Sequence, residues 1–314
     1  MKYLYLILLV LICSCSEDEK TVETATNNRT IGAYVRTTET FNADFAVGNA
    51  EDVFSIEIET HDELNGQLLD AIEVFLSFKK FGQVPSSEVL FQVMESDIFE
   101  IGEFGKPRAI IAISFEQASQ SLGLQIEDIE CKDQFEVRLN YKLLDGRSFT
   151  TGQSSSKILA ADDFWSSPFC YTINVIEPIE DDLFTGMYSI ENLVDGPLGA
   201  TFGDTQFVEI TKGHSTNTRE MRLRHRLSIL EEQPRIFRFT VSCEQSVFSK
   251  NLLSSKIGFC DIDPAILLGP DVENGPLDMT DDSVFELWFV EGYLGFDGNC
   301  GFGTAPSRLR FSKQ

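Results

Sequence analysis

Residues 134–150, QFEVRLNYKLLDGRSFT, contain the pattern that decides the fold class. Apolar and polar residues alternate from Phe135 to Leu143, and this period of two places the apolar side chains on one face of a β-strand. Asp145-Gly146 follows, a dipeptide typical of tight hairpin turns, and Ser148 begins a return strand. The stretch therefore predicts an antiparallel β-hairpin with one buried face.

Short alternating runs separated by turn residues occupy most of the remaining chain. In the first half they lie at residues 52–60, 72–78 and 171–176, and in the second half at 186–193, 207–211, 220–229, 235–242, 284–290 and 309–312. One helix is also indicated, because Ser114 and Gln117 form a capping box and Gly123 stands where a C-cap glycine belongs. The sequence predicts an all-β protein with one short helix.

An acidic, proline-containing segment, EPIEDD at residues 177–182, divides the chain. Polar linkers of this kind are where domain boundaries fall. The length of 314 residues suits two domains of ordinary size, and a 42% hydrophobic composition is sufficient for their cores. We therefore expect two antiparallel β domains, at residues 31–177 and 181–314, each sandwich-like or barrel-like.

The first fifteen residues predict where the protein resides. Lys2 precedes an apolar run at residues 3–12 and then Cys13-Ser14-Cys15, the order of a secretory signal that ends in a bacterial lipobox. The apolar run is too short to span a bilayer. We expect residues 1–14 to be removed as a signal peptide and Cys15 to be acylated, with an ordinary signal peptide cut elsewhere as the alternative.

The polar residues 16–30 have no apolar periodicity and are expected to form, with the lipidated Cys15, a flexible acidic tether. Their first four residues, Ser-Glu-Asp-Glu, resemble the export signal of Bacteroidota lipoproteins that reach the outer face of the outer membrane. This resemblance implies an outer-membrane protein that is held by lipid and faces the cell exterior.

Charge and composition exclude several function classes. Fifty acidic residues against 25 basic ones give a net charge of −25, which repels nucleic acid and anionic lipid as general partners. Three histidines leave little room for histidine-based catalysis, and no GxSxG motif occurs. We expect a protein that is not an enzyme, although the many carboxylates leave a glycosidase-type secreted hydrolase as an alternative.

Five cysteines follow the lipobox and enter an oxidising compartment, where disulfides form. Cys131 and Cys170 both stand at predicted strand starts of the first domain and could pair. In the second domain we favour Cys260 with Cys300, because both lie in glycine-rich loop sequence, which leaves Cys243 over. The sequence alone establishes neither pair.

Aromatic residues near the C-terminus are candidates for stacking on a sugar ring. Trp288 shares a strand face with Glu286, and Tyr293 and Phe296 follow in a glycine-rich loop. Trp165 is a weaker candidate. Core packing is the alternative for all four side chains.

Arginines gather in one part of this acidic chain. Paired strands could align them as a stripe that binds acidic sugars or an acidic protein surface, with Arg222, Arg224 and Arg226 as the preferred ligand contacts. Internal charge balance is the alternative interpretation. The full set is Arg219, Arg222, Arg224, Arg226, Arg235 and Arg238.

An acidic loop near residue 275 is a weak candidate for a calcium site, since calcium takes six to eight oxygen ligands. The spacing matches no EF-hand, and a solvated loop is the alternative, so we expect no obligatory cofactor. The residues concerned are Asp271, Glu273, Asp278, Asp281 and Asp282.

The order of these features resembles the surface lipoproteins that accompany SusC/SusD-type transporters in Bacteroidota, broadly the SusE and SusF type. The resemblance runs through the lipobox, the acidic tether, FGKPR at residues 104–108, LGL at 122–124, DGR at 145–147, SPFCY at 167–171 and FTGMY at 184–188. It implies an immunoglobulin-like first domain that acts as a spacer and a C-terminal domain that binds oligosaccharide or polysaccharide. A structural subunit of such a transporter complex, without a glycan site, is the alternative.

Overall fold

The computed structural model describes residues 32–161, 164–197, 199–203, 205–225, 233–255, 266–293 and 304–314. The predicted signal peptide, the predicted lipidation site Cys15 and the predicted tether lie outside these residues. Ala33–Gln314 form one compact unit. Within the described ranges, no helix is both long enough and apolar enough to cross a membrane.

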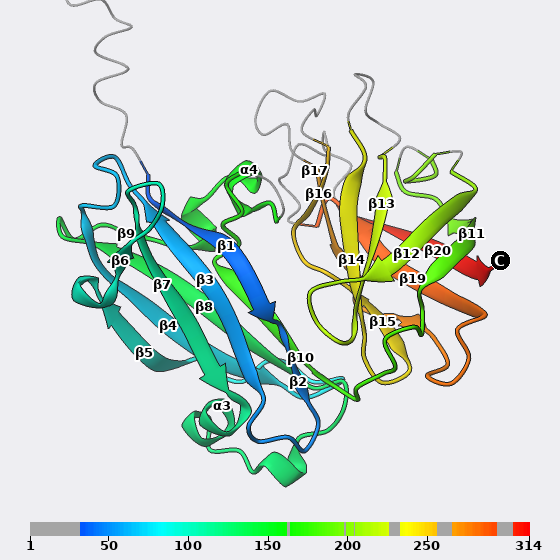
Figure 1. The fold of residues 1–314 in the computed structure, drawn as a ribbon, viewed down its shortest axis with the longest axis horizontal. Helices are drawn as coiled ribbons and strands as arrows, with labels where there is room; N and C mark the ends of the chain where they lie inside the picture. Colours follow the sequence, from blue (N-terminus) through cyan, green and yellow to red (C-terminus); the bar gives the residue numbers. More distant parts are fainter. Residues whose placement is uncertain are drawn as a thin grey trace, which may run out of the picture. The chain divides into compact units, whose positions relative to one another are not determined.

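The first half of the unit is a β-sandwich with the strand order of an immunoglobulin domain (Figure 1). Its sheets have the orders β1-β3-β7-β6 and β2-β10-β8-β4-β5, with β9 beside β8, which correspond to the A-B-E-D and A′-G-F-C-C′ sheets of that fold. The strands are β1 (Tyr34–Asn42), β2 (Asp44–Ala46), β3 (Val53–His61), β4 (Leu69–Lys79), β5 (Val89–Glu95), β6 (Glu100–Ile101), β7 (Pro107–Ser114), β8 (Gln134–Leu143), β9 (Ser148–Phe149) and β10 (Cys170–Ile176).

The hairpin predicted from residues 134–150 is confirmed. Side chains of β8 alternate strictly between buried and half-buried positions, and β9 pairs with it in antiparallel register. Gly146 has φ +86°, the left-handed conformation that the turn requires. The apolar face of β8 lies in the core between the two sheets.

The predicted helix is α3 (Phe115–Ser121), and both hydrogen bonds of its capping box are present. Ser114 Oγ accepts from the Gln117 backbone N–H, and Gln117 Oε1 accepts from the Ser114 N–H, each at 3.1 Å. A second helix, α4 (Ser156–Leu159), was not predicted, because four residues are too few to give a periodic pattern. Short 3₁₀ turns are η1 (Ser96–Ile98), η2 (Ile126–Asp128) and η3 (Thr151–Gln153).

The second half closes into a seven-stranded barrel. Of the two architectures that the sequence left open for this domain, sandwich and barrel, the barrel is therefore the one observed. Successive pairing runs β19-β20-β11-β12-β13-β14-β15, and a parallel contact between Val247 and Trp288 joins β15 back to β19. The strands are β11 (Gly186–Val194), β12 (Phe207–Lys212), β13 (Thr218–Leu223), β14 (Arg235–Val241), β15 (Gln245–Phe248), β19 (Val284–Glu291) and β20 (Ala305–Lys313), with β16 (Leu252–Ser255), β17 (Ile266–Pro270) and β18 (Gly275–Pro276) attached.

Aromatic side chains fill the barrel. Phe248 and Phe289 stack with ring centroids 4.7 Å apart, and Phe285 and Phe311 stack at 4.8 Å. Tyr188 packs edge-on against Phe285. Since these rings occupy the interior, the barrel is a packed core, and a ligand site has to be sought outside it.

A disulfide between Cys131 and Cys243 joins the sandwich to the barrel, so the expected pairing of Cys131 with Cys170 is wrong. β8 and β10 are antiparallel, and their starts therefore lie at opposite ends of the pair. Cys131 is next to the end of β10, where the Lys132 N–H donates to the Val175 carbonyl, and Cys170 keeps a free thiol. Cys260 and Cys300 lie outside the described residues.

Candidate functional site

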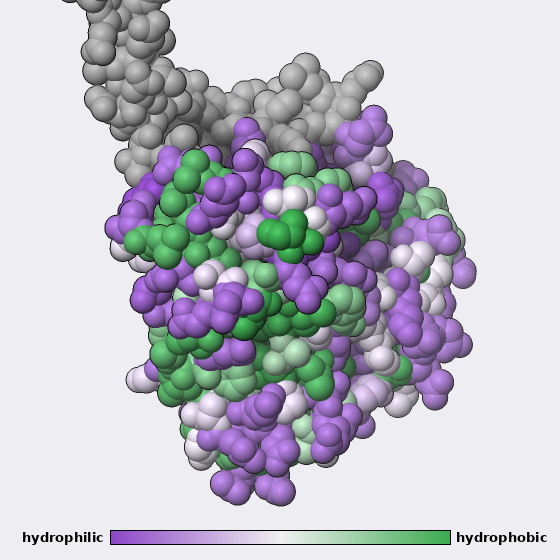
Figure 2. All heavy atoms as spheres, turned by 60° about the vertical axis from the view of Figure 1, so that its left-hand side comes forward, coloured by the Kyte–Doolittle hydropathy of each residue, from purple (hydrophilic) through white to green (hydrophobic). Residues whose placement is uncertain are grey.

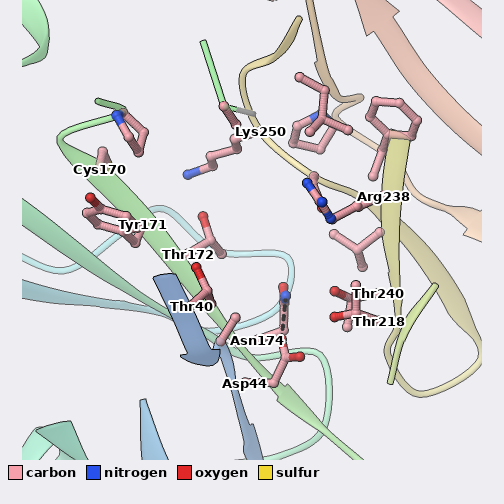
Figure 3. Close-up of a pocket in the computed structure, with 18 of the residues that line it drawn as sticks. Thr40, Asp44, Cys170, Tyr171, Thr172, Asn174, Thr218, Arg238, Thr240 and Lys250 are labelled. Carbon is pink, nitrogen blue, oxygen red and sulfur yellow. Dashed lines mark hydrogen bonds between the residues drawn. The ribbon is translucent and has the colours of Figure 1, made fainter. Parts of the chain in front are cut away.

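A cavity of about 610 Å³ lies where the sandwich meets the barrel. Its sandwich wall comes from β1, β2 and β10, and its barrel wall from β13, β14 and the residues that follow β15. This volume is in the range of sites for small molecules and short oligomers, which are common at domain junctions. In the close-up, Arg238 and Lys250 extend from the barrel toward Tyr171 and Thr172 of β10 (Figure 3).

Hydroxyl groups dominate the sandwich wall. Thr37 Oγ1 and Tyr171 Oη form a hydrogen bond of 2.8 Å, and burial raises the pKa of Tyr171, so its phenol stays protonated at neutral pH. The Thr172 hydroxyl is buried and has no hydrogen-bond partner among the described residues. A buried hydroxyl without a partner is costly, and a polar ligand in the cavity would supply one.

Two irregularities in β1 shape this wall. The pairing of β1 with β3 shifts register between Thr37 and Glu39 and again between Thr40 and Asn42. Such bulges re-aim side chains and are frequent beside binding sites. They place the threonine-rich run at residues 37–40 along the cavity.

The cavity floor is a buried polar network that includes both domains. Asp44, which is 2% exposed, accepts a hydrogen bond of 2.7 Å from Ser215 Oγ of the barrel and one of 3.1 Å from Asn174 Nδ2. Burial raises the pKa of Asp44 above 3.8, against the opposing effect of these hydrogen bonds. Gln134 Nε2 donates to Asn174 Oδ1 at 3.0 Å and extends the network.

Paired ions form the barrel wall. Arg238 Nε lies 2.6 Å from Glu220 Oε1, and Lys250 Nζ lies 2.5 Å from Glu136 Oε1 across the domain junction. Burial lowers the pKa of Lys250, but the interactions with Cys170, Tyr293 and the Glu136 carboxylate outweigh it and leave the pKa raised. Lys250 therefore remains charged at neutral pH and, like the Arg238 guanidinium, can donate to ligand oxygens.

The free thiol of Cys170 also faces the cavity. Burial raises its pKa, with Lys250 as the largest opposing influence, so the thiol is protonated at neutral pH. A protonated thiol is a weak nucleophile. It contributes a soft, weakly polar surface beside the Lys250 ammonium.

Of the aromatic residues predicted to stack on sugar, Tyr293 lines the cavity and Trp288 does not. The Tyr293 ring packs directly over Gly269, where a Cβ would lie 2.3 Å from it. Trp288 is half-buried on the Glu286 face of β19, but the Arg308 guanidinium covers its ring at 3.9 Å and its indole N–H donates to Glu286 at 2.9 Å.

Of the remaining two aromatic candidates, Trp165 is not among the residues that line the cavity. The Trp165 ring packs edge-on against Tyr34 and Phe164. Phe296 lies outside the described residues.

The arginines do not form one stripe. Arg219 is fully buried and donates to the carbonyls of Leu183, Glu180, Thr216 and Thr218, so its role is structural. Arg222 and Arg224 are exposed and line a separate groove of about 820 Å³ on the outer barrel wall, together with Phe207. Arg226 lies outside the described residues.

In the described part of the chain, neither the acidic loop nor any other region brings three His, Cys, Asp or Glu side chains together to hold a metal. Asp282 pairs with Lys313 and accepts the Phe184 N–H, and Asp278 accepts the Thr280 N–H at 2.8 Å. These carboxylates stabilise local turns. No group of three metal-binding side chains in the described residues includes Asp271, Glu273 or Asp281. The Asp281 carboxylate accepts the Ser283 N–H.

Most of the cavity residues were not predicted, because they come together from strands that are far apart in the sequence. The run of threonines in β1 and the basic positions Arg238 and Lys250 were the available signals. No protein-family model and no curated protein sequence matches the chain. The fold and the cavity therefore carry the functional argument.

Proposed function

We propose that this protein is a non-catalytic, lipid-anchored protein of the bacterial outer-membrane surface that captures an oligosaccharide in the cavity between the sandwich and the barrel. The cavity is the observation that carries the proposal. It combines hydroxyls, amides, paired ions and the aromatic rings of Tyr171 and Tyr293 in one space. Polyhydroxylated ligands are recognised by groups of these kinds.

The fixed geometry of the wall supports binding of this type. Hydrogen bonds and ion pairs hold Tyr171, Arg238 and Lys250 in place before a ligand arrives, so less side-chain freedom is lost on binding. Thr172 offers a hydroxyl that can both donate and accept. The Tyr293 ring provides an apolar surface at the same cavity.

Two further parts of the proposal rest on the sequence: the lipid anchor and an association with a SusC/SusD-like transporter. Cys15 within the lipobox would hold the protein at the outer membrane, and hydrophobic burial of its acyl chains would retain it there. If a single cavity binds oligosaccharide weakly, other binding proteins beside the same transporter would raise the overall affinity for the oligosaccharide.

A glycan-array screen of residues 16–314, followed by titration calorimetry of each oligosaccharide retained, tests the proposal. Trp288→Phe should leave the affinity unchanged, because Trp288 does not line the cavity. Tyr293→Ala should lower the affinity at least tenfold. Retention of no glycan would refute the proposal and favour the alternative of a structural subunit in an outer-membrane complex.

A further inference from the structure

We propose that one end of the sandwich domain is a lipid-docking surface formed by apolar side chains at the tips of three turns. We call it the tether end and define it by residues 62–68, 101–107 and 143–148. The proposal rests on the proposed lipid anchor, because the chain that leads from Cys15 enters the sandwich at this end.

Strand pairing places the three turns together. Tyr34, the first residue of β1, lies opposite His61, the last residue of β3. Leu143, which ends β8, lies opposite Leu69, which begins β4, and the β7 residue Arg108 pairs with Glu59 near the end of β3. The start of β1 and the labels β6 and β9 accordingly lie at the same end of the sandwich in Figure 1.

Four large apolar side chains stand exposed on these turns: Leu64 is 49% exposed, Ile101 71%, Phe104 66% and Leu144 65%. Each of the three turns contributes at least one of them. Figure 2 shows hydrophobic patches among hydrophilic side chains on the side of the molecule that carries the sandwich. Exposed apolar groups gathered from separate turns mark an interaction surface.

Polar contacts hold the three turns to one another. Lys106 Nζ donates to Asn65 Oδ1 at 2.8 Å, and Arg147 Nη2 pairs with Glu63 at 3.0 Å. The Leu144 N–H donates to the Leu68 carbonyl at 2.9 Å.

The turn at residues 62–68 is also fixed from within. The Asp62 carboxylate accepts the N–H groups of Leu64, Gly66 and Leu68, as well as the Tyr141 hydroxyl. The apolar tips are therefore presented in a set arrangement, as a docking surface requires.

The length of the preceding chain identifies a lipid surface as the occupant. Seventeen residues separate Cys15 from Ala33. If these residues form the flexible tether that their composition predicts, its root-mean-square extension is about 20–25 Å. An acylated Cys15 would thus keep the tether end close to the bilayer, where apolar turn residues can insert at the headgroup boundary.

Charge at the tether end favours neutral over anionic lipid. Glu63 and Asp145, next to Leu64 and Leu144, are both paired with Arg147. Across the three turns, four acidic residues outnumber two basic ones: Asp62, Glu63, Glu103 and Asp145 against Lys106 and Arg147. We expect phosphatidylcholine vesicles to be contacted more strongly than vesicles rich in phosphatidylglycerol.

The test uses residues 16–314 with an N-terminal histidine tag, tethered to phosphatidylcholine vesicles that contain a nickel-chelating lipid. Phe104→Trp places an indole at the tether end, and Phe81→Trp places one after β4, at the opposite end of the sandwich, where Phe81 is 53% exposed. Against the unsubstituted chain as baseline, Phe104→Trp should give a blue-shifted emission that brominated lipid quenches. Phe81→Trp should give neither.

An untethered sample supplies the second measurement. Ile101→Ser combined with Leu144→Ser should lower the fraction that co-floats with vesicles at least threefold, and Val84→Ser, at an 86% exposed site, should leave it unchanged. Equal signals from positions 104 and 81, or no lipid contact in the tethered sample, would overturn the proposal and leave a partner protein as occupant. Acylation of Cys15 is measured separately by mass spectrometry. A missing lipid anchor can therefore be distinguished from a tether end that does not contact lipid.

Discussion

Thr172 lines the cavity, and its hydroxyl is buried without a partner among the described residues. Thr172→Val keeps the shape of the side chain and removes this hydroxyl. We expect the free energy of unfolding to stay constant or rise by about 1 kcal/mol, since an unpaired buried polar group is removed. Affinity for the oligosaccharide that we propose binds in the cavity should fall about tenfold.

Urea denaturation and calorimetry measure the two effects of Thr172→Val. Thr211→Val, on the exposed outer barrel wall, is the matched control and should change neither quantity. A loss of stability without a loss of affinity would show that the Thr172 hydroxyl serves the fold and not the ligand.

Arg219 donates to four backbone carbonyls while fully buried. Arg219→Met leaves these acceptors unpaired and should lower the free energy of unfolding by about 3 kcal/mol. Arg222→Met removes a charge from an exposed position of the same strand and should cost less than about 0.5 kcal/mol. Equal effects in urea denaturation would contradict the structural role assigned to Arg219.

Asp44 gives the protein a specific pH dependence. Because burial raises its pKa, the folded state keeps a proton that the unfolded chain releases near pH 3.8. The Asp44 contribution to the free energy of unfolding therefore falls as the pH rises from about 3.8 through the folded-state pKa. Asp44→Asn should remove this fall, which denaturation of both proteins at pH 4 to 7 would measure. A pH-independent difference in stability between them would show that Asp44 does not titrate as inferred.

At the level of elements, Gly123 ends α3 with φ +69° in open space, since no atom lies within 4 Å of a Cβ built there. Gly123→Ala should therefore cost about 1 kcal/mol through backbone conformation alone. Gly152 is equally open and lacks the positive φ, so Gly152→Ala should be neutral. Thermal unfolding of the two variants compares them, and an equal shift in Tm would refute the conformational explanation.

Local patterns were sufficient to predict elements of this kind. The alternation in β8, the turn at Gly146 and the capping box of α3 each depend on residues close in sequence, and all three are confirmed. Closure of the barrel depends instead on a parallel contact between Val247 and Trp288, which no local pattern encodes. The sequence consequently left sandwich and barrel open for the second domain.

For the whole molecule, predictions from the sequence fail where the interacting residues lie far apart along the chain. The cavity joins Thr40 of β1, Thr172 of β10 and Lys250 of the turn after β15, so no short motif identifies it. Cys131 was paired with the wrong cysteine because residues at the starts of antiparallel strands look equivalent in a sequence. Trp288 was correctly placed on its strand face, but the sequence could not reveal that Arg308 covers its ring.

The disulfide between Cys131 and Cys243 closes a segment of 112 residues across the domain junction. Cys131→Ser combined with Cys243→Ser should lower the free energy of unfolding by about 4 kcal/mol and weaken ligand capture, because the cavity walls belong to different domains. Cys170→Ser alters a free thiol and should have a smaller effect on stability. Peptide mapping without reduction checks the pairing directly, and a Cys131–Cys170 peptide would contradict it.

Capture of an oligosaccharide at the domain junction is tested most directly by hydrogen–deuterium exchange, with and without a glycan retained in the array. The account predicts slower exchange on ligand addition in residues 37–44, 170–174 and 238–250, and unchanged exchange in residues 284–291, which contain Trp288. Slower exchange confined to residues 284–291, or no change in any of these segments at saturating glycan, would contradict it.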